Sequence, residues 1–163
     1  MRRGFPEHWT KPSVNGALAR SRERLVVVSD LHMSRADGPI SDPFADDEAF
    51  AGLLASLTSD GVPTRLILLG DTVDLVLAAA PSRVRRGADP LLAARRGLDA
   101  IAGAHPRVFA ALGAFSRAGY KVDVVPGNHD TGLLHRSVQQ RLRELILGGT
   151  GGRHADSPIR FWP

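Results

Sequence analysis

The sequence predicts an α/β fold built around a parallel sheet, and three observations support this class. Short apolar runs at residues 25–28, 66–69 and 122–125 are rich in Val, Ile and Leu. Segments with the apolar period of amphipathic helices lie between these runs and after the last of them. A string of polar, turn-forming residues directly follows each run. The alternation of strand and helix is typical of α/β domains, whose ligand sites lie where parallel strands end.

Length and composition limit the alternatives. The chain has 163 residues, of which 43% are hydrophobic, and this suits one globular domain. Cysteine is absent, which excludes disulfides and thiolate metal sites. No apolar stretch approaches the roughly 20 residues of a membrane span, and no signal sequence is apparent. The formal charge of +4 is modest and scattered, which favours solvated surface charge over a dedicated anion-binding surface.

The first elements follow a polar N-terminal arm at residues 1–24, and the single domain is expected over residues 25–163. Residues 25–29 form a β-branched run that predicts a buried strand. Residues 33–45 contain glycine and two prolines and predict a loop. Asp46 and Asp47 then begin a helix, because acidic residues are favoured in a first helical turn. Apolar residues at helical spacing continue this helix until Gly61.

The later elements repeat the pattern. Residues 65–69 are the second strand, and residues 81–89, which are rich in arginine, form a connection. A helical region covers residues 90–118, and Pro106 should break it near His105. Residues 120–125 are the third strand. Leu134 and Val138 begin the apolar stripe of a last helix, which the glycines at 148 and 149 should end.

The three polar strings carry the chemistry. They are Asp30-Leu-His32, then Gly70-Asp71-Thr-Val-Asp74, and finally Gly127-Asn128-His129-Asp130. Each alone can be explained as a turn or a helix cap. Together they place carboxylate, imidazole and amide groups at one edge of a sheet, which predicts a metal site with oxygen and nitrogen ligands.

These strings resemble those of the calcineurin-like metallophosphoesterase superfamily. The local motifs Ser-Asp-Leu-His, Gly-Asp-x-x-Asp-Leu and Pro-Gly-Asn-His-Asp are most similar to those of the bacterial branch that includes UDP-2,3-diacylglucosamine pyrophosphohydrolases. The resemblance covers about residues 25–147. It implies a layered α/β/β/α sandwich, of which this chain would hold the N-terminal half.

The resemblance also implies roles for individual residues. Asp30 and His32 would bind one metal, Asp71 would bridge two metals, and Asn128 would bind the second. His129 would contact the phosphate and protonate the leaving oxygen, and Asp130 would orient His129. Asp74 would be structural or would support the ligands, and Gly70 and Gly127 would let the backbone approach the metals.

The chain departs from the family pattern after the third string. Family members complete the site with an isolated histidine and a Gly-His-x-His string, and neither is recognisable here. His135 comes too soon, within the expected last helix, and His154 lacks the preceding glycine and the second histidine. The chain is therefore expected to be truncated relative to the family, with weak metal binding and little activity.

The main expectation is a metal-dependent phosphoesterase. Two divalent ions, with Mn first and Fe, Zn, Co or Ni as alternatives, would activate a hydroxide that hydrolyses a phosphomonoester, phosphodiester or pyrophosphate. The substrate would be a phosphorylated small molecule or a lipid-linked compound, in the cytoplasm or at the periphery of a membrane. Two alternatives stay open: an inactive remnant that binds metal or a partner, and a nuclease. The oligomeric state is left open.

Overall fold

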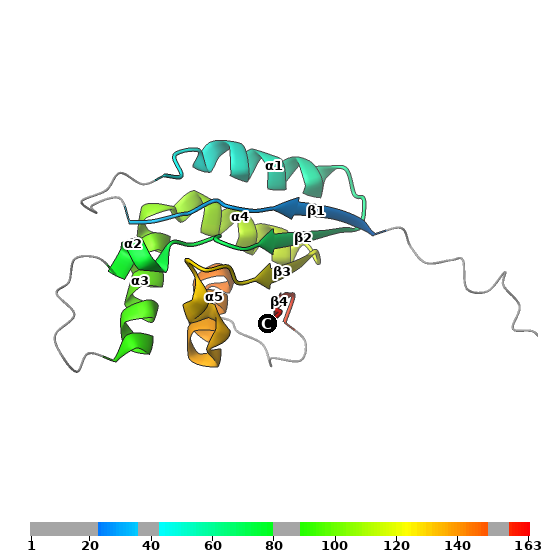
Figure 1. Cartoon of the computed structure of the whole chain (residues 1–163). Coiled ribbons are helices and arrows are strands. Elements are labelled where there is room, and N and C mark those ends of the chain that lie inside the picture. The colour runs from blue at the N-terminus through cyan, green and yellow to red at the C-terminus, as the bar shows by residue number, and fades with distance from the viewer. Residues whose placement is uncertain (1–22, 36–42, 80–88, 150–156) are drawn as a thin grey trace, which may run out of the picture.

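The protein forms one parallel sheet with helices packed against it, as seen in a computed structural model that describes residues 23–35, 43–79, 89–149 and 157–163. The strands are β1 (Arg24–Val28), β2 (Thr64–Leu69), β3 (Lys121–Val125) and β4 (Ile159–Phe161). They lie side by side in the order β1-β2-β3-β4, and all three neighbouring pairs are parallel (Figure 1). The predicted α/β class is therefore confirmed.

Five α-helices occur among the described residues. They are α1 (Asp47–Ser59), α2 (Leu75–Ala79), α3 (Pro90–Ala104), α4 (Pro106–Arg117) and α5 (Arg136–Leu147), and a short 3-10 helix covers Thr131–Leu134. The Asp46 side chain caps α1 by accepting a hydrogen bond from the Ala49 N–H at 3.0 Å. The predicted break at Pro106 separates α3 from α4, because proline has no N–H to continue the helix. None of the described helices has the length and apolar character needed to cross a membrane.

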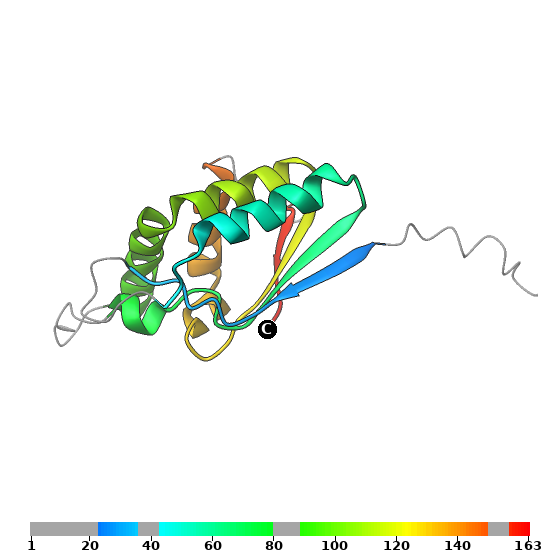
Figure 2. The same ribbon diagram turned by 90° about the horizontal axis from the view of Figure 1, so that it is seen from above.

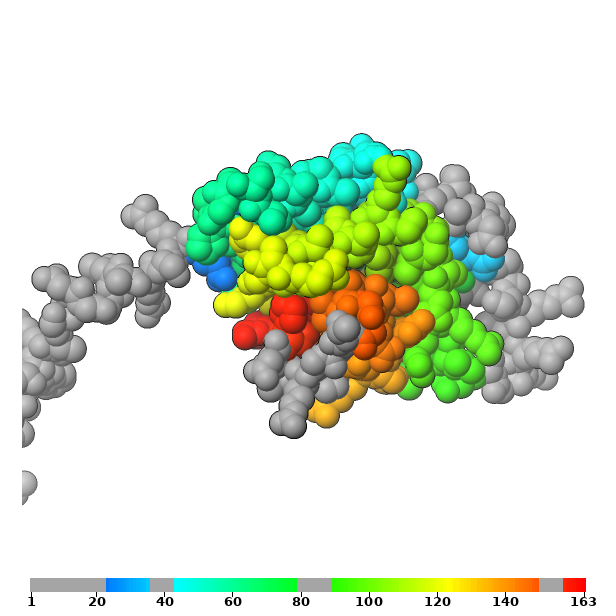
Figure 3. All heavy atoms as spheres, turned by 180° about the vertical axis from the view of Figure 1, so that it is seen from behind, coloured from blue at the N-terminus to red at the C-terminus, as the bar shows by residue number. Residues whose placement is uncertain are grey.

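The main core lies between the sheet and helices α1, α4 and α5, which occupy the same side of it (Figure 2). Figure 3 shows these three helices packed side by side over that face. The inward strand positions are fully buried, as Leu66, Leu68, Val122 and Val124 illustrate. The sequential strand order explains the arrangement, because right-handed crossovers that advance in one direction place every helix on one face.

The opposite face of the sheet is not covered by a helix among the described residues. Leu25, Val27 and Leu69 alternate with the inward positions, and about half or more of each side chain is exposed. Parallel sheets are normally covered on both faces. The described residues form a single sheet, and the second sheet of the expected sandwich is not among them.

The structure differs from the sequence predictions in several minor ways. Helix α2 and strand β4 were not predicted, and Leu134 lies in the 3-10 helix and is exposed rather than part of the apolar stripe. His135 precedes α5 instead of lying within it. The division into an arm and a domain stays a prediction, since residues 1–22 lie outside the described part, as do the arginine-rich residues 81–88.

Candidate metal centre

The three polar strings lie next to one another at the carboxyl edge of the sheet, because the strands before them are parallel neighbours. Backbone hydrogen bonds join the strings beyond the ends of the strands. The Asp30 N–H donates to the Gly70 carbonyl at 3.2 Å, and the Gly70 N–H donates to the Val125 carbonyl at 2.8 Å. Each string is thereby fixed relative to the next one.

The first and second strings are joined most closely. The His32 N–H donates to the Asp71 carbonyl at 2.8 Å, and the Met33 N–H donates to the Thr72 carbonyl at 3.2 Å. The Asp74 N–H returns a bond of 2.7 Å to the Met33 carbonyl. The ladder of the sheet therefore continues into the loops and sets the positions of the side chains there.

Three residues of this edge have a left-handed backbone. The φ angles are 56° at Asp30, 50° at His32 and 48° at Asp71, and these are the only non-glycine residues with positive φ in the described part of the chain. Such a conformation costs about 1–3 kcal/mol at a non-glycine residue and persists where surrounding contacts impose it. It concentrates at functional sites, and here it coincides with three of the predicted ligands.

The side chains of these three residues converge. One ligand atom each from Asp30, His32 and Asp71 lies within 4.8 Å of the others. Two ligands of one first-row metal ion are separated by at most about twice a bond length of 2.0–2.2 Å. The separation therefore suits an ion with small adjustments of the side chains, and the donor set of two carboxylates and one imidazole suits Mn, Fe, Co, Ni or Zn.

Gly127 makes room for the Asp71 carboxylate. A Cβ atom added at Gly127 would lie 2.3 Å from Asp71 Oδ1 and 2.7 Å from the Asp71 backbone nitrogen. The same Oδ1 atom accepts a hydrogen bond of 2.8 Å from the His129 N–H. The third string thus packs directly on Asp71, and only glycine fits at the point of contact.

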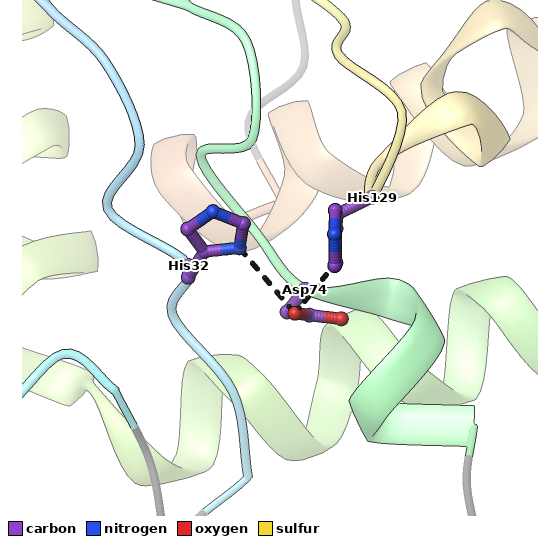
Figure 4. Close-up of side chains that lie close together, drawn as sticks. All are labelled: His32, Asp74 and His129. Atoms are coloured by element: carbon purple, nitrogen blue, oxygen red, sulfur yellow. Dashed lines mark hydrogen bonds and ion pairs between the residues drawn. The ribbon is translucent and has the colours of Figure 1, made fainter.

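Asp74 holds the two histidines of the site. Its Oδ2 atom lies 2.8 Å from Nδ1 of His129 and 3.4 Å from Nδ1 of His32 (Figure 4). Its Oδ1 atom accepts a bond of 2.7 Å from the Leu77 N–H in α2. The imidazole rings of His32 and His129 meet edge to face, with centroids 4.6 Å apart. These three residues form a second group that could hold an ion, but the hydrogen bonds already engage both Asp74 oxygens.

The orienting contact that the sequence analysis expected from Asp130 is made by Asp74 instead. The Asp130 carboxylate is fully buried and accepts hydrogen bonds from the backbone N–H groups of Gly127 and Thr72. Burial raises the pKa of Asp130, and the backbone donors at Gly127, Thr72 and Val73 oppose that rise. Asp130 therefore ties the second string to the third, while the Asp74 carboxylate faces the His129 ring.

The other predicted residues are placed as follows. Asn128 is exposed in the turn between Gly127 and His129. His135 is exposed at the start of α5 and belongs to neither metal-capable group found in the described residues. His8 and His154 lie outside the part that the structure describes. His32 and His129 are therefore the histidines that the described residues bring to this edge.

The sequence predicts for His105 only a position at the helix end before Pro106. The structure shows that its side chain is buried between α1 and the segment that carries the first string. The neighbouring Pro106 signalled a helix break there, but nothing in the sequence indicated that the ring faces inward.

Comparisons with known proteins add no further constraint. No protein-family model matches the chain, and neither a curated protein nor a solved structure matches it. The interpretation of this edge therefore depends on its own geometry and chemistry.

Proposed function

We propose that this protein is a metal-dependent phosphoesterase, whose site is the carboxyl edge of the parallel sheet. One observation carries the proposal: the backbone is left-handed at Asp30, His32 and Asp71, the same residues whose side chains converge. Turns that only connect secondary-structure elements do not require three non-glycine residues with a left-handed backbone in two neighbouring loops. Backbone strain of this kind is retained where a geometry of side chains is required.

The residues assigned to metal binding are the three donors that converge, together with Asn128, which the resemblance to metallophosphoesterases implies. Asp30, His32 and Asp71 would hold one divalent ion, and Asp71 with Asn128 would contribute to a second, with Mn²⁺ as the first candidate. Bound divalent ions supply Lewis acidity, which withdraws charge from a phosphoryl oxygen and acidifies water. They also offset the negative charge of Asp30 and Asp71, which would otherwise repel a phosphate.

His129 is the residue best suited to proton transfer. The contact between its Nδ1 atom and Asp74 orients the ring and leaves Nε2 as the nitrogen available to a substrate. We therefore assign to His129 the donation of a proton to the leaving oxygen, and to Asp74 the orientation of His129.

The test measures Mn²⁺ binding by titration calorimetry and Mn²⁺-dependent hydrolysis of bis-p-nitrophenyl phosphate on the same preparations. Asp71→Asn should abolish both, because a neutral amide with one oxygen cannot replace the carboxylate that the two ions would share. His129→Gln should reduce turnover by roughly 10²–10⁴-fold, the usual contribution of a general acid, while Mn²⁺ still binds. Asp99→Asn, which removes an exposed carboxylate paired with Arg141, is the matched control and should change neither.

The outcomes separate the alternatives. Failure of the wild-type chain to bind Mn²⁺ would contradict the proposal. Binding without hydrolysis would favour a metal-binding protein that lacks turnover, and the presence of only two histidines at the described edge makes this the second candidate. Hydrolysis of DNA, with a steep decrease of binding as salt increases, would favour a nuclease.

A further inference from the structure

His105 lies at the junction of α3 and α4, away from the candidate metal centre in sequence but joined to it in space. Its side chain is buried, and only 4% of the residue is exposed. Pro106 begins α4 and interrupts the helix, so that His105 adopts a non-helical conformation, with φ −118° and ψ 52°, between the two helices. This placement directs the ring toward α1 and the segment after β1.

The ring is engaged at both nitrogens. Nδ1 lies 2.8 Å from Oδ1 of Asp47, in the first turn of α1. Nε2 lies 3.0 Å from the backbone carbonyl of Ser34. Because a carbonyl oxygen can only accept, Nε2 carries the hydrogen of this bond. The ring of Phe44 packs edge to face against the imidazole, with centroids 5.8 Å apart.

Ser34 belongs to the segment that carries Asp30 and His32. On one side, this segment is bonded to the second string through Met33, whose N–H donates to Thr72 and whose carbonyl accepts from Asp74. On its other side, Ser34 is buried and its carbonyl is bonded to His105. Contacts on two sides therefore fix the segment: the second string on one side, and on the other the hydrogen-bonded series Asp47–His105–Ser34.

We propose that His105 is a positioning residue for the metal centre: it fixes the segment 30–34 in the conformation that Asp30 and His32 need in order to bind a divalent ion. This inference depends on the proposed function for its metal and adds a residue outside the three strings. Because the backbone at Asp30 and His32 is strained, the segment would relax to another conformation if no contact held it in place. The hydrogen bond from His105 to Ser34 opposes this relaxation. Its removal should therefore increase the mobility of both Asp30 and His32.

The test compares two replacements of similar size. His105→Gln keeps an N–H donor for the Ser34 carbonyl, whereas His105→Leu keeps the packing and removes the donor. In metal-free protein, amide hydrogen exchange at His32 and Met33 should be faster in the Leu variant than in wild type, and close to wild type in the Gln variant. Amides of the central pair β2–β3 report global opening and correct for any general loss of stability.

The second measurement is the Mn²⁺ dissociation constant at a temperature where every variant is folded. The Leu variant should bind roughly tenfold more weakly, the lower end of what supporting residues contribute to metal sites, and the Gln variant should recover most of the affinity. Asp47→Asn, a milder change in a half-buried first turn, should weaken binding in the same direction if the Leu variant does not fold. Glu48→Gln is the control, because its exposed ion pair with Arg107 also joins α1 to α4.

The results distinguish this inference from the proposed function. Equal Mn²⁺ affinity in wild type and the Leu variant would overturn the role of His105 and leave the metal centre intact. The role of His105 would also be overturned if amide hydrogen exchange at His32 and Met33 increased only by the same factor as exchange in the β2–β3 pair. A wild-type chain that binds no Mn²⁺ would refute the metal centre itself, and with it any positioning role toward a metal.

Discussion

Asp30 is the most exposed of the three left-handed residues at the candidate metal centre. It is exposed, its backbone is left-handed, and its carboxylate lies near that of Asp71. In the absence of a cation these two charges repel each other. In the proposed metal centre, Asp30 would therefore contribute to metal binding and would lower the stability of the metal-free protein.

Asp30→Asn should separate these two effects. Asparagine tolerates the left-handed region well and carries no charge, so the free energy of unfolding of metal-free protein should rise by about 0.2–1 kcal/mol, the usual size of an exposed charge interaction. Mn²⁺ affinity should fall by more than about tenfold. Urea unfolding with and without Mn²⁺ measures both, and a loss of stability in the metal-free protein would contradict the argument.

Gly127 provides a second prediction at this scale, with Gly52 as its control. Gly127→Ala places a Cβ against Asp71 and should cost about 1–3 kcal/mol through overpacking, with loss of Mn²⁺ binding. Gly52→Ala lies within α1, where a Cβ would have nothing within 4 Å, and should stabilise the protein by about 0.5–1 kcal/mol. The same substitution thus has opposite signs at the two positions, and thermal unfolding of both variants checks it.

At the scale of elements, Asp60 joins α1 to the sheet. It follows α1 and accepts two hydrogen bonds from Arg24 at the start of β1, at 2.6 and 3.1 Å. The Arg24 guanidinium, assisted by the Val62 N–H, lowers the pKa of Asp60 below the ordinary 3.8. The unfolded chain therefore takes up the Asp60 proton at a higher pH than the folded protein does.

This shift gives a prediction with a definite sign. The contribution of Asp60 to stability is fully present above pH 3.8 and is lost as the pH falls through the lower pKa of the folded protein. Asp60→Asn should be less stable than wild type at neutral pH, and the difference should shrink on acidification. Urea midpoints across this range measure it, and two curves that stay parallel down to the lowest pH would contradict the prediction.

Most elements could be predicted because each had a local cause. The strands are β-branched runs, and the break before Pro106 follows from a missing N–H. Helix α2 and strand β4 are only five and three residues long, too short for a period to be recognised in the sequence. The parallel order of the strands also brought the three strings to one edge, as expected from alternating strands and helices.

The partners of individual side chains could not be predicted in the same way. Asp130 follows His129 directly in sequence, which favoured a contact between them. In the structure, backbone N–H groups of two strings bind the Asp130 carboxylate, while Asp74 approaches His129 from the start of α2. The burial of His105 against Ser34 likewise depends on how three elements pack, which no local pattern encodes.

At the scale of the whole molecule, the described helices cover one face of the sheet, and no described helix covers the other. Leu68 and Leu69 are adjacent in β2 and point to opposite faces, with 1% and 48% of each exposed. Leu68→Ala should cost about 2–5 kcal/mol, as large-to-small core changes do. Leu69→Ala should cost less than about 1 kcal/mol.

The comparison of these two variants tests the one-sided arrangement itself. Denaturant unfolding at a low and a high protein concentration should give the same ordering of the two variants. If Leu69→Ala were as costly as Leu68→Ala only at the higher concentration, the outer face would be buried by association between copies. If the two variants lost the same unfolding free energy at both concentrations, Leu69 would be buried in the single chain, contrary to the exposure that the structure gives it.

The order of the strands also bears on how the chain is made. Among the described strands, β2, β3 and β4 each pair with the strand synthesised just before them. A growing chain that leaves the ribosome can therefore extend the sheet one strand at a time, and no late strand has to enter between two that are already paired. The segments after β1 and β2, which carry Asp30, His32 and Asp71, can meet before β3 emerges, and the segment with His129 completes the edge afterwards.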